Sequence, residues 1–367
     1  MLKIIISGAN GYVASNFIYN LLDRHYEVVA LVRGNKKYSA EERMFDVMND
    51  INDGAFTVPK NLRIFNYSLL DENFGLPEET LSELFQGDVD YYHFAASLKY
   101  DFKAKDEIFQ TNMDGVENSV AVFSKYAASS NSRFFFISTA YSCGKMAGRF
   151  EEKFYDIADI EEFRNYYEQS KRYAENLIRK HMENEGLNAH ILRLSQVVGN
   201  NKTGITKTDY GIFDFSRRIQ SLATRTPDLK LRVKVDPEST QNLIPIDKVV
   251  SYLMQTVKIQ QLPVILNMVA KNAVRNSDIL KTLGQLLPIE LIPQMDLDKS
   301  EMSVYERIIS IGMSFTASYT GTNIQFDTTK LDEIMEADDN EATAESIHRM
   351  ITYFLDENSG KKAKIAC

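Results

Sequence analysis

Apolar runs and amphipathic stretches alternate through the first half of the chain. A β-branched run at residues 3–7 is followed by a stretch with helical spacing at 16–25 and by a second β-branched run at 27–33. The order strand, helix, strand is typical of the first unit of a parallel sheet. The same alternation continues, and it predicts further strands at 62–68, 89–97, 133–142 and 188–198 and helices at 107–129 and 166–184.

The strand predicted at 133–142 begins as a continuous apolar run, as a parallel strand buried on both faces does. Strand–helix alternation over about 200 residues requires right-handed crossovers, and it predicts an α/β protein with a Rossmann-like, doubly wound parallel sheet. Beyond Gly199 the alternation stops, and residues 200–211 are polar and rich in turn formers. We therefore expect a Rossmann domain at 1–200 and a smaller, mixed C-terminal domain for the substrate at 201–367.

The composition, with 44% apolar and 25% charged residues, is that of an ordinary soluble globular protein. A net charge of -9 disfavours nucleic acid and membrane surfaces as partners. No apolar run reaches the roughly 18 residues that a membrane-spanning helix needs. The two cysteines and the five histidines show neither a disulfide framework nor metal-ligand spacing. We therefore expect a cytoplasmic protein without a metal site.

A glycine-rich turn joins the first predicted strand to the first predicted helix. Gly8 permits a tight turn there, and Gly11 allows the backbone to approach a pyrophosphate closely. The helix that follows points its first amide groups at the same anion. The turn therefore predicts a dinucleotide site, with a plain strand–helix turn as the alternative.

The second predicted strand ends at a basic residue. An acidic residue at this place would bind the ribose hydroxyls of NAD, whereas Arg33 favours the 2′-phosphate of NADP. Lys36 and Lys37 add positive charge directly after it. We therefore expect NADPH as the cofactor, with an ordinary solvated basic turn as the alternative.

A tyrosine and a lysine stand four residues apart in the helix predicted at 166–184. Tyr167 and Lys171 share one face of that helix, and a nearby ammonium favours the phenolate form of a tyrosine. The phenol can then exchange a proton with a carbonyl oxygen during hydride transfer. Thr139 ends the buried strand, where ligands of parallel sheets bind, and its hydroxyl can bond the same oxygen. We therefore predict that Thr139, Tyr167 and Lys171 form the catalytic group.

Several landmarks along the chain resemble the extended short-chain dehydrogenases and reductases. They are GANGYVA at 8–14, HFAAS at 93–97, NMDG at 112–115, ISTAYSCG at 137–144, YYEQSK at 166–171 and NLIPIDKVV at 242–250. Within that group the sequence is most similar to the thioester-reductase and fatty-acyl-reductase branch, which includes reductases that release chains from carrier proteins. The resemblance spans nearly the whole chain and implies the fold expected above.

The resemblance also assigns roles to individual residues. It implies that the three catalytic residues named above form the family's triad. It implies cofactor contacts for Gly8, Asn10, Gly11, Tyr12, Val13, Arg33, Lys36, Leu69, Ala95, Ala96, Lys171 and Val197. The chain departs from the family at the end of the third strand, where Tyr67-Ser68-Leu69 replaces the common Gly-Asp-Leu.

The leading interpretation is the NADPH-dependent reduction of an acyl thioester, held on a carrier protein or on coenzyme A, to an aldehyde or alcohol. Reduction of an aldehyde or ketone on a small metabolite is the alternative that uses the same residues. A nucleotide-sugar epimerase or dehydratase is disfavoured by Arg33 and by Gln241, which stands where those enzymes generally hold the sugar diphosphate with an arginine. A non-catalytic NADP-sensing protein would have no need of the catalytic group.

A basic stretch at 217–234 stands out in this acidic chain. It contains Asp228 and the six cations Arg217, Arg218, Arg225, Lys230, Arg232 and Lys234. It is either a solvated surface or a landing surface for a phosphopantetheine arm or an acidic carrier protein, whose negative charge would be attracted to it.

Overall fold

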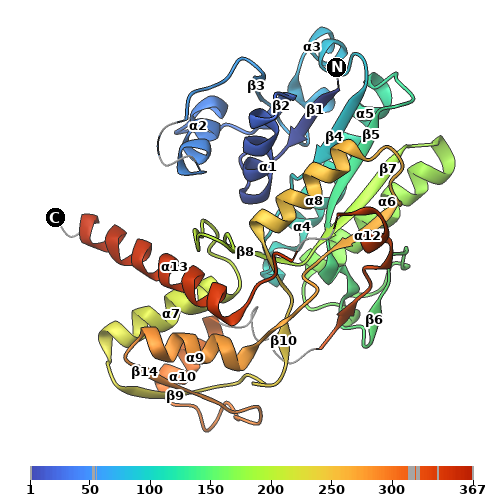
Figure 1. Ribbon diagram of the computed structural model, residues 1–367. Helices are drawn as coiled ribbons and strands as arrows, with labels where there is room; N and C mark the ends of the chain where they lie inside the picture. Colours follow the sequence, from blue (N-terminus) through green and yellow to red (C-terminus); the bar gives the residue numbers. More distant parts are fainter. Residues whose placement is uncertain are drawn as a thin grey trace. The chain divides into compact units, whose positions relative to one another are not determined.

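The computed structural model describes residues 2–51, 54, 56–312, 319, 323–336 and 339–365 (Figure 1). The chain divides into two compact units. The first comprises Met1–Leu194, Val250–Met268 and Phe326–Glu336, and the second comprises Ser195–Val249, Val269–Gln325 and Ala337–Cys367. Because the two units interleave along the chain, a single boundary between residues 200 and 201 stays a prediction.

The strands and helices follow one another through both units, with short helical turns between some of them. In chain order they are β1 (Lys3–Ser7), α1 (Tyr12–Asp23), β2 (Glu27–Val32), α2 (Ala40–Ile51), β3 (Leu62–Asn66), α3 (Glu78–Leu84), β4 (Val89–His93), α4 (Lys105–Phe109), α5 (Gly115–Tyr126), β5 (Arg133–Thr139), β6 (Arg149–Phe150), α6 (Tyr166–Glu185), β7 (Ala189–Leu194), β8 (Gln196–Val198), α7 (Ile212–Arg225), β9 (Leu229–Val233), β10 (Thr240–Gln241), β11 (Leu243–Pro245), α8 (Ile246–Lys258), β12 (Ile265–Met268), β13 (Val274–Arg275), α9 (Asn276–Leu286), β14 (Ile289–Pro293), α10 (Val304–Gly312), β15 (Gln325–Phe326), α12 (Thr329–Ile334) and α13 (Ala344–Ile365).

The first unit is built on a seven-stranded sheet in the order β12-β7-β5-β4-β1-β2-β3. Every neighbouring pair of strands in it is parallel. The sheet grows in one direction through β2 and β3 and in the other through β4 and β5, so the strand order reverses between β1 and β4. Ligands of such sheets bind beyond the carboxyl ends of the strands at this point. The predicted Rossmann-like parallel sheet is confirmed.

Side chains alternate between the two faces of the central strand β4, and helices cover both faces (Figure 1). Tyr91 packs against Phe123 of α5, with ring centres 6.3 Å apart. Its neighbour Tyr92 packs against Phe17 of α1 at 5.0 Å, and its hydroxyl lies 2.9 Å from Thr256 Oγ1 of α8. The centre of the sheet is therefore buried on both sides, which explains the apolar runs in strands such as β1 and β2.

The prediction of a single strand at 188–198 was wrong, because the structure has two strands there. β7 ends at Leu194 and β8 begins at Gln196, so the chain leaves the main sheet at Ser195. β8 pairs with β11, with Val197 opposite Ile244, in the second unit. The position beside β7 in the main sheet is taken by β12, which arrives from far along the chain and was not predicted.

The second unit is mixed in secondary structure and has a core of its own. Strands β9 and β14 pair in parallel, with Leu231 opposite Leu291. Phe213 of α7 packs against Phe354 of α13, with ring centres 5.3 Å apart, and Leu283 of α9 is fully buried in the same core. Among the described residues of both units, no helix combines the length and the apolarity that crossing a membrane requires.

Candidate active site

The turn after β1 is closed by backbone contacts that tolerate no side chain at its first glycine. Gly8 has a φ of +65°, and a Cβ atom there would lie 2.8 Å from the backbone nitrogen of Ala95 in the loop after β4. Gly8 N donates a hydrogen bond to the Tyr67 hydroxyl at 3.2 Å, and Gly11 N donates to Gly8 O at 2.9 Å. The sequence treated Tyr67 only as a departure from the family, whereas here it supports the turn.

Helix α1 follows this turn directly and presents its N-terminus there. Gly11 is the N-cap and contributes no capping side chain, and helix N-terminal amides attract anions. Asn10, Tyr12 and Val13 lie half-buried around it. A close-packed glycine at a helix N-terminus fits the pyrophosphate of a dinucleotide, so these residues would hold that group.

Four cations lie where β2 ends. Arg33, Lys36 and Lys37 are exposed, and helix α2 brings Arg43, whose guanidinium donates a hydrogen bond to the Arg33 carbonyl oxygen. Neither Arg43 nor α2 was expected from the sequence, although a capping box marks the start of the helix. Ser39 Oγ accepts from Glu42 N at 3.1 Å, and Glu42 Oε2 accepts from Ser39 N at 2.7 Å. The spacing Ser-x-x-Glu at residues 39–42 is the sequence signal that predicts the start of this helix.

Helix α6 carries Tyr167 in its first turn and Lys171 one turn later. Its start is fixed by Asn165, whose Oδ1 accepts a hydrogen bond from Glu168 N at 3.0 Å. Its end is fixed by Gly186, which adopts the left-handed conformation with a φ of 73°. Tyr167 is half-buried and Lys171 is buried, so the two side chains share one face of a helix with well-defined ends.

The Lys171 side chain reaches strand β5. Its Nζ donates a hydrogen bond to Ile137 O at 2.8 Å and lies 4.6 Å from the centre of the Phe136 ring. Thr139, two residues further along, is buried at the carboxyl end of the strand, and its Oγ1 donates to Leu194 O at 3.3 Å. The structure therefore brings Lys171 to the strand that ends in Thr139, and the catalytic roles of Thr139, Tyr167 and Lys171 stay predictions.

Burial sets the electrostatics around Lys171. The side chain is almost completely buried, which lowers the pKa of Lys171 to about 7, while the Glu175 carboxylate acts in the opposite direction. His93 at the end of β4 is also buried, and burial, together with the Lys171 charge, lowers the pKa of His93 to about 3. His93 is therefore neutral at physiological pH, and Lys171 titrates near neutrality, as groups at functional sites often do.

The remaining cofactor residues lie in several elements. Ala95 is buried and Ala96 half-buried in the loop after β4. Leu69 packs on Gly115, where a Cβ atom would lie 2.6 Å from Leu69 Cδ2. Val197 is on β8 of the second unit. Cofactor contacts of these four residues stay predictions.

Asn112 is a polar residue of this region to which the sequence assigned no role. The helix predicted at 107–129 is interrupted by a π-helical turn at Gln110–Asp114, and Asn112 is buried within it. Its Oδ1 accepts a hydrogen bond from Ser97 N at 2.7 Å, and its Nδ2 donates to Ser170 Oγ at 2.9 Å. Asn112 thereby ties the loop after β4 to α6 next to Lys171.

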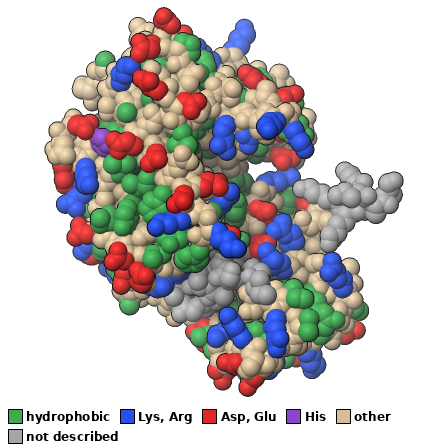
Figure 2. All heavy atoms as spheres, turned by 180° about the vertical axis from the view of Figure 1, so that it is seen from behind, with side chains coloured by type: hydrophobic (Ala, Val, Ile, Leu, Met, Phe, Trp, Pro, Cys, Tyr) green, Lys and Arg blue, Asp and Glu red, His purple; other side chains and the backbone are tan. Residues whose placement is uncertain are grey.

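The basic stretch at 217–234 is largely paired with acidic side chains of its own unit. Arg217 and Arg218 both contact Asp214, at 2.5 and 2.8 Å. Lys230 pairs with Glu290 and Arg232 with Glu306, each at 2.8 Å. On the face that Figure 2 presents, Lys and Arg side chains and Asp and Glu side chains both lie at the surface. These pairs favour the interpretation of a solvated surface over a landing surface.

A Rossmann-like sheet with a glycine turn after β1, cations after β2 and a Tyr–Lys pair beside β5 defines a class of proteins. It is the class of extended short-chain dehydrogenases and reductases, which are NAD(P)-dependent oxidoreductases. Within it, the chain belongs to the family described as "Male sterility protein", whose profile matches residues 6–253.

Two curated relatives match parts of the chain. Peramine synthetase A of Epichloe festucae is 27% identical over 182 residues, which are 49% of this chain and 6% of that protein. The putative fatty acyl-CoA reductase CG8303 of Drosophila melanogaster is 25% identical over 229 residues, 54% of this chain and 41% of that protein. The chain thus spans less than half the length of either relative.

Solved structures share the fold over nearly the whole chain. The terminal R domain of the myxalamid PKS-NRPS pathway has a TM-score of 0.75 at 17% identity, covering 98% of this chain and 91% of that one. A thiolation-reductase di-domain from an archaeal non-ribosomal peptide synthetase has a TM-score of 0.73 at 19% identity, covering 97% and 76%. UDP-glucuronic acid 4-epimerase of Bacillus cereus, solved with NAD, reaches 0.66 at 16%, covering 97% and 99%. At these identities the likeness concerns the fold alone.

Proposed function

We propose that the protein is an NADPH-dependent reductase of acyl thioesters. The observation that carries this proposal is the buried Lys171 ammonium, 2.8 Å from Ile137 O on the strand that ends in Thr139, with Tyr167 one turn earlier on the same helix. Family membership supports the redox chemistry. The matched fatty acyl-CoA reductase and the terminal R domain of the myxalamid pathway support a thioester as the substrate.

The chain's own residues supply the stabilisation of charge and the proton. A nicotinamide cofactor, when bound, would supply the hydride for the thioester carbonyl carbon. Thr139 Oγ1 and the Tyr167 hydroxyl hydrogen-bond the carbonyl oxygen as negative charge develops on it. Tyr167 passes its proton to that oxygen, and the Lys171 charge makes the resulting phenolate less costly. The thiohemiacetal then collapses to an aldehyde and a thiol, and a second reduction would yield an alcohol.

Selection of NADPH over NADH is part of the proposal and rests on Arg33, Lys36 and Arg43. A 2′-phosphate carries two negative charges near neutrality, and a guanidinium binds phosphate through parallel hydrogen bonds. The cations after β2 would supply these contacts.

Delivery of the substrate by a carrier protein, in the cytoplasm, is also proposed. The matched archaeal structure joins a thiolation domain to its reductase, and the myxalamid domain is terminal in its pathway. Coenzyme A thioesters present the same phosphopantetheine thioester, so both sources offer the same reacting group.

The epimerase alternative is weakened by Gln241, which is buried and donates to Asn276 Oδ1 at 2.8 Å.

The test is NADPH oxidation by the whole chain against acyl-coenzyme A thioesters, acyl-carrier thioesters and the matching free aldehydes. We expect turnover of at least one thioester class, with release of free thiol in step with NADPH loss. Turnover of free aldehydes alone would replace the proposal by a small-carbonyl reductase. Absence of NADPH oxidation with every carbonyl compound, despite NADPH binding, would favour a non-catalytic sensing protein.

A further inference from the structure

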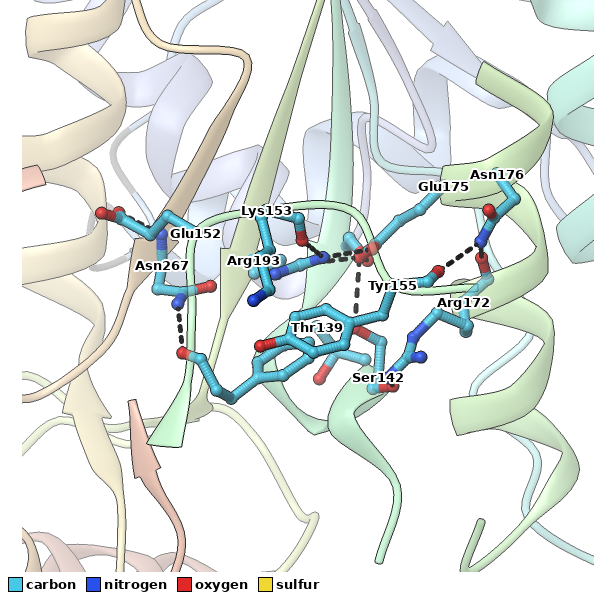
Figure 3. Close-up of polar contacts among 12 residues, drawn as sticks. Thr139, Ser142, Glu152, Lys153, Tyr155, Arg172, Glu175, Asn176, Arg193 and Asn267 are labelled. Carbon is cyan, nitrogen blue, oxygen red and sulfur yellow. Dashed lines mark hydrogen bonds and ion pairs between the residues drawn. The ribbon is translucent and has the colours of Figure 1, made fainter. Parts of the chain in front are cut away.

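A buried carboxylate lies one helical turn beyond Lys171 on α6. Glu175 is fully buried, and its Oε1 accepts hydrogen bonds from Ser138 Oγ at 2.5 Å and from Ser142 Oγ at 3.2 Å. Arg193 of β7 closes the cluster, donating through Nε to Oε1 at 3.0 Å and through Nη2 to Oε2 at 2.6 Å. Figure 3 shows Glu175 and Arg193 facing one another, with Ser142 beside them.

The partners of Glu175 come from the elements that hold the catalytic residues. Ser138 directly precedes Thr139 on β5, and Ser142 lies in the short turn that follows it. Glu175 and Lys171 are four residues apart on α6, so they share one face. The carboxylate therefore ties the Thr139 strand end to the helix of Tyr167 and Lys171.

Such a cluster is costly to assemble. Removing two charges from water costs several kcal/mol per ion, and a buried ion pair seldom returns more than it costs. Arg193 is nevertheless fully buried and makes further hydrogen bonds to the carbonyl oxygens of Glu151 and Lys153, at 3.1 and 3.0 Å. Figure 3 draws dashed lines from the Arg193 guanidinium group to the Lys153 carbonyl oxygen and to Glu175. A site this costly and this completely bonded indicates a role beyond stability.

Resting on the function proposed above, we propose that Glu175 is a positioning residue. It fixes α6 against the end of β5 and places a buried negative charge one turn from Lys171 on the same helix face. The Glu175 carboxylate also acts to raise the pKa of Lys171 against the lowering effect of burial.

The other charged or titratable groups around Lys171 cannot take over this role. His93 on β4 is held neutral, since its pKa lies near 3. In the short helical turn Ala140–Cys143 after β5, burial raises the pKa of the Cys143 thiol to about 12, which keeps it uncharged. On α6 itself, Glu168 contacts Arg164, and Arg172 adds a further cation. Acidic groups on α4 and on the π-helical turn are exposed to solvent.

The experiment compares Glu175→Gln with Glu152→Gln. Glu152 is a matched control because it is also a buried carboxylate of the same unit, accepting hydrogen bonds from Asn267 N at 2.9 Å and Lys330 N at 2.6 Å. The Lys171 titration is followed by NMR of protein labelled with 13Cε-lysine, with Lys171→Arg to assign the signal. The rate of NADPH-dependent reduction is measured over the same pH range.

We expect the Lys171 midpoint to fall by about one pH unit in Glu175→Gln and to stay unchanged in Glu152→Gln. The high-pH limb of the activity profile moves down by the same amount in the first variant only. A midpoint that is the same in both variants and in the wild type would overturn the proposal. If Glu175→Gln does not fold, the double variant Glu175→Gln/Arg193→Met replaces the buried ion pair by neutral groups, and the same downward shift is expected. The NMR titration needs no substrate, so failure of the proposed function and failure of this inference are separable.

Discussion

The turn after β1 and the end of β5 lie at the same edge of one parallel sheet, yet they differ in the groups that form them. At the turn, the backbone packs closely around Gly8, and the charged side chains of Arg33 and Lys36 nearby are exposed. At the end of β5, the charged side chains Lys171, Glu175 and Arg193 are all buried. The proposed cofactor end thus combines close backbone packing with solvent-exposed charge, whereas the proposed catalytic end contains buried charge.

The difference sets the size of each effect. Exposed charges are screened by salt within about 8–10 Å and contribute little individually. Buried charges interact through a medium of lower dielectric, so each change there alters the pKa of its neighbours. We therefore expect substitutions near the end of β5 to change chemistry and titration strongly, and substitutions after β2 to change cofactor preference modestly.

The largest effect is expected from Tyr167→Phe, which removes the hydroxyl and keeps the ring. Because the proton donor is lost, kcat falls by at least about 100-fold while NADPH binding is retained. Tyr166→Phe is the control, since the Tyr166 ring packs against Phe102 at 5.3 Å and the hydroxyl has no proposed role. Steady-state rates and NADPH titrations measure the two effects, and near-normal turnover of Tyr167→Phe would contradict the mechanism.

The second prediction concerns stability and pH at Lys171. Its folded pKa of about 7 lies below the ordinary value of 10.5, so between these values the unfolded chain binds more protons. The free energy of unfolding contributed by this group therefore rises with pH, by up to about 1.4 kcal/mol per pH unit, and is lowest below pH 7. Lys171→Met lacks this term.

Urea unfolding at pH 6 and pH 9 tests that prediction. We expect Lys171→Met to be inactive. At pH 6 its free energy of unfolding is expected to be higher than that of the wild type, and at pH 9 this difference in free energy of unfolding is smaller by about 2–3 kcal/mol. Lys60→Met, at an exposed position, is expected to follow the wild type at both values. A constant difference between pH 6 and pH 9 would show that Lys171 is not desolvated.

The third prediction tests the close backbone packing at the turn after β1. Gly8→Ala places a Cβ atom 2.8 Å from Ala95 N, whereas Gly186→Ala has a similar φ of 73° and nothing within 4 Å. Both variants lose roughly 1 kcal/mol of stability from the left-handed conformation. Gly8→Ala loses about 1–3 kcal/mol more through overpacking and also binds NADPH more weakly. Equal losses in urea unfolding and cofactor titration would contradict the close packing.

The fourth prediction tests the exposed cations after β2. Arg33→Asp lowers the preference for NADPH over NADH by about 10-fold, because one charge-assisted contact is lost from an exposed site. Added salt reduces the preference of the wild type in the same direction. Lys60→Asp makes the same charge change at a distant exposed position. An unchanged ratio of the two dissociation constants in Arg33→Asp would contradict the assignment.

The smallest effect is expected in the second unit. Arg217→Glu combined with Arg218→Glu breaks the contacts to Asp214. Because both pairs are part-exposed, KM for an acyl-coenzyme A or carrier-bound substrate changes by less than about twofold. A larger rise in KM that salt reproduces, with a free aldehyde unaffected, would instead support a landing surface for the carrier.

Local periodicity was sufficient for the parallel sheet but not for its outer strand. β1 to β5 follow one another along the chain, so apolar runs and helical spacing indicate them directly. β12 joins the sheet beside β7 from a distant segment, and the chain leaves the sheet at Ser195. Pairing between distant segments depends on contacts that no local window contains.

The proposed pair Tyr167 and Lys171 could be selected from the sequence because its spacing is local, whereas the buried charges around it could not. Glu175 belongs to a polar helix, and a polar residue in an amphipathic helix is ordinarily expected on its solvent face. It is buried because Arg193 of β7 is buried opposite it. Arg43 differs from these buried charges, because the capping box formed by Ser39 and Glu42 is a local sequence signal for the start of helix α2, which carries Arg43.

The most direct test of the proposed chemistry is a single turnover with NADPH deuterated at the transferable C4 position. The substrate is an acyl-coenzyme A thioester, and the product is analysed by mass spectrometry. We predict one deuterium atom at the former thioester carbon of the aldehyde, two if an alcohol forms, and none above background with Tyr167→Phe. An unlabelled product, or label incorporated only from added free aldehyde, would contradict thioester reduction.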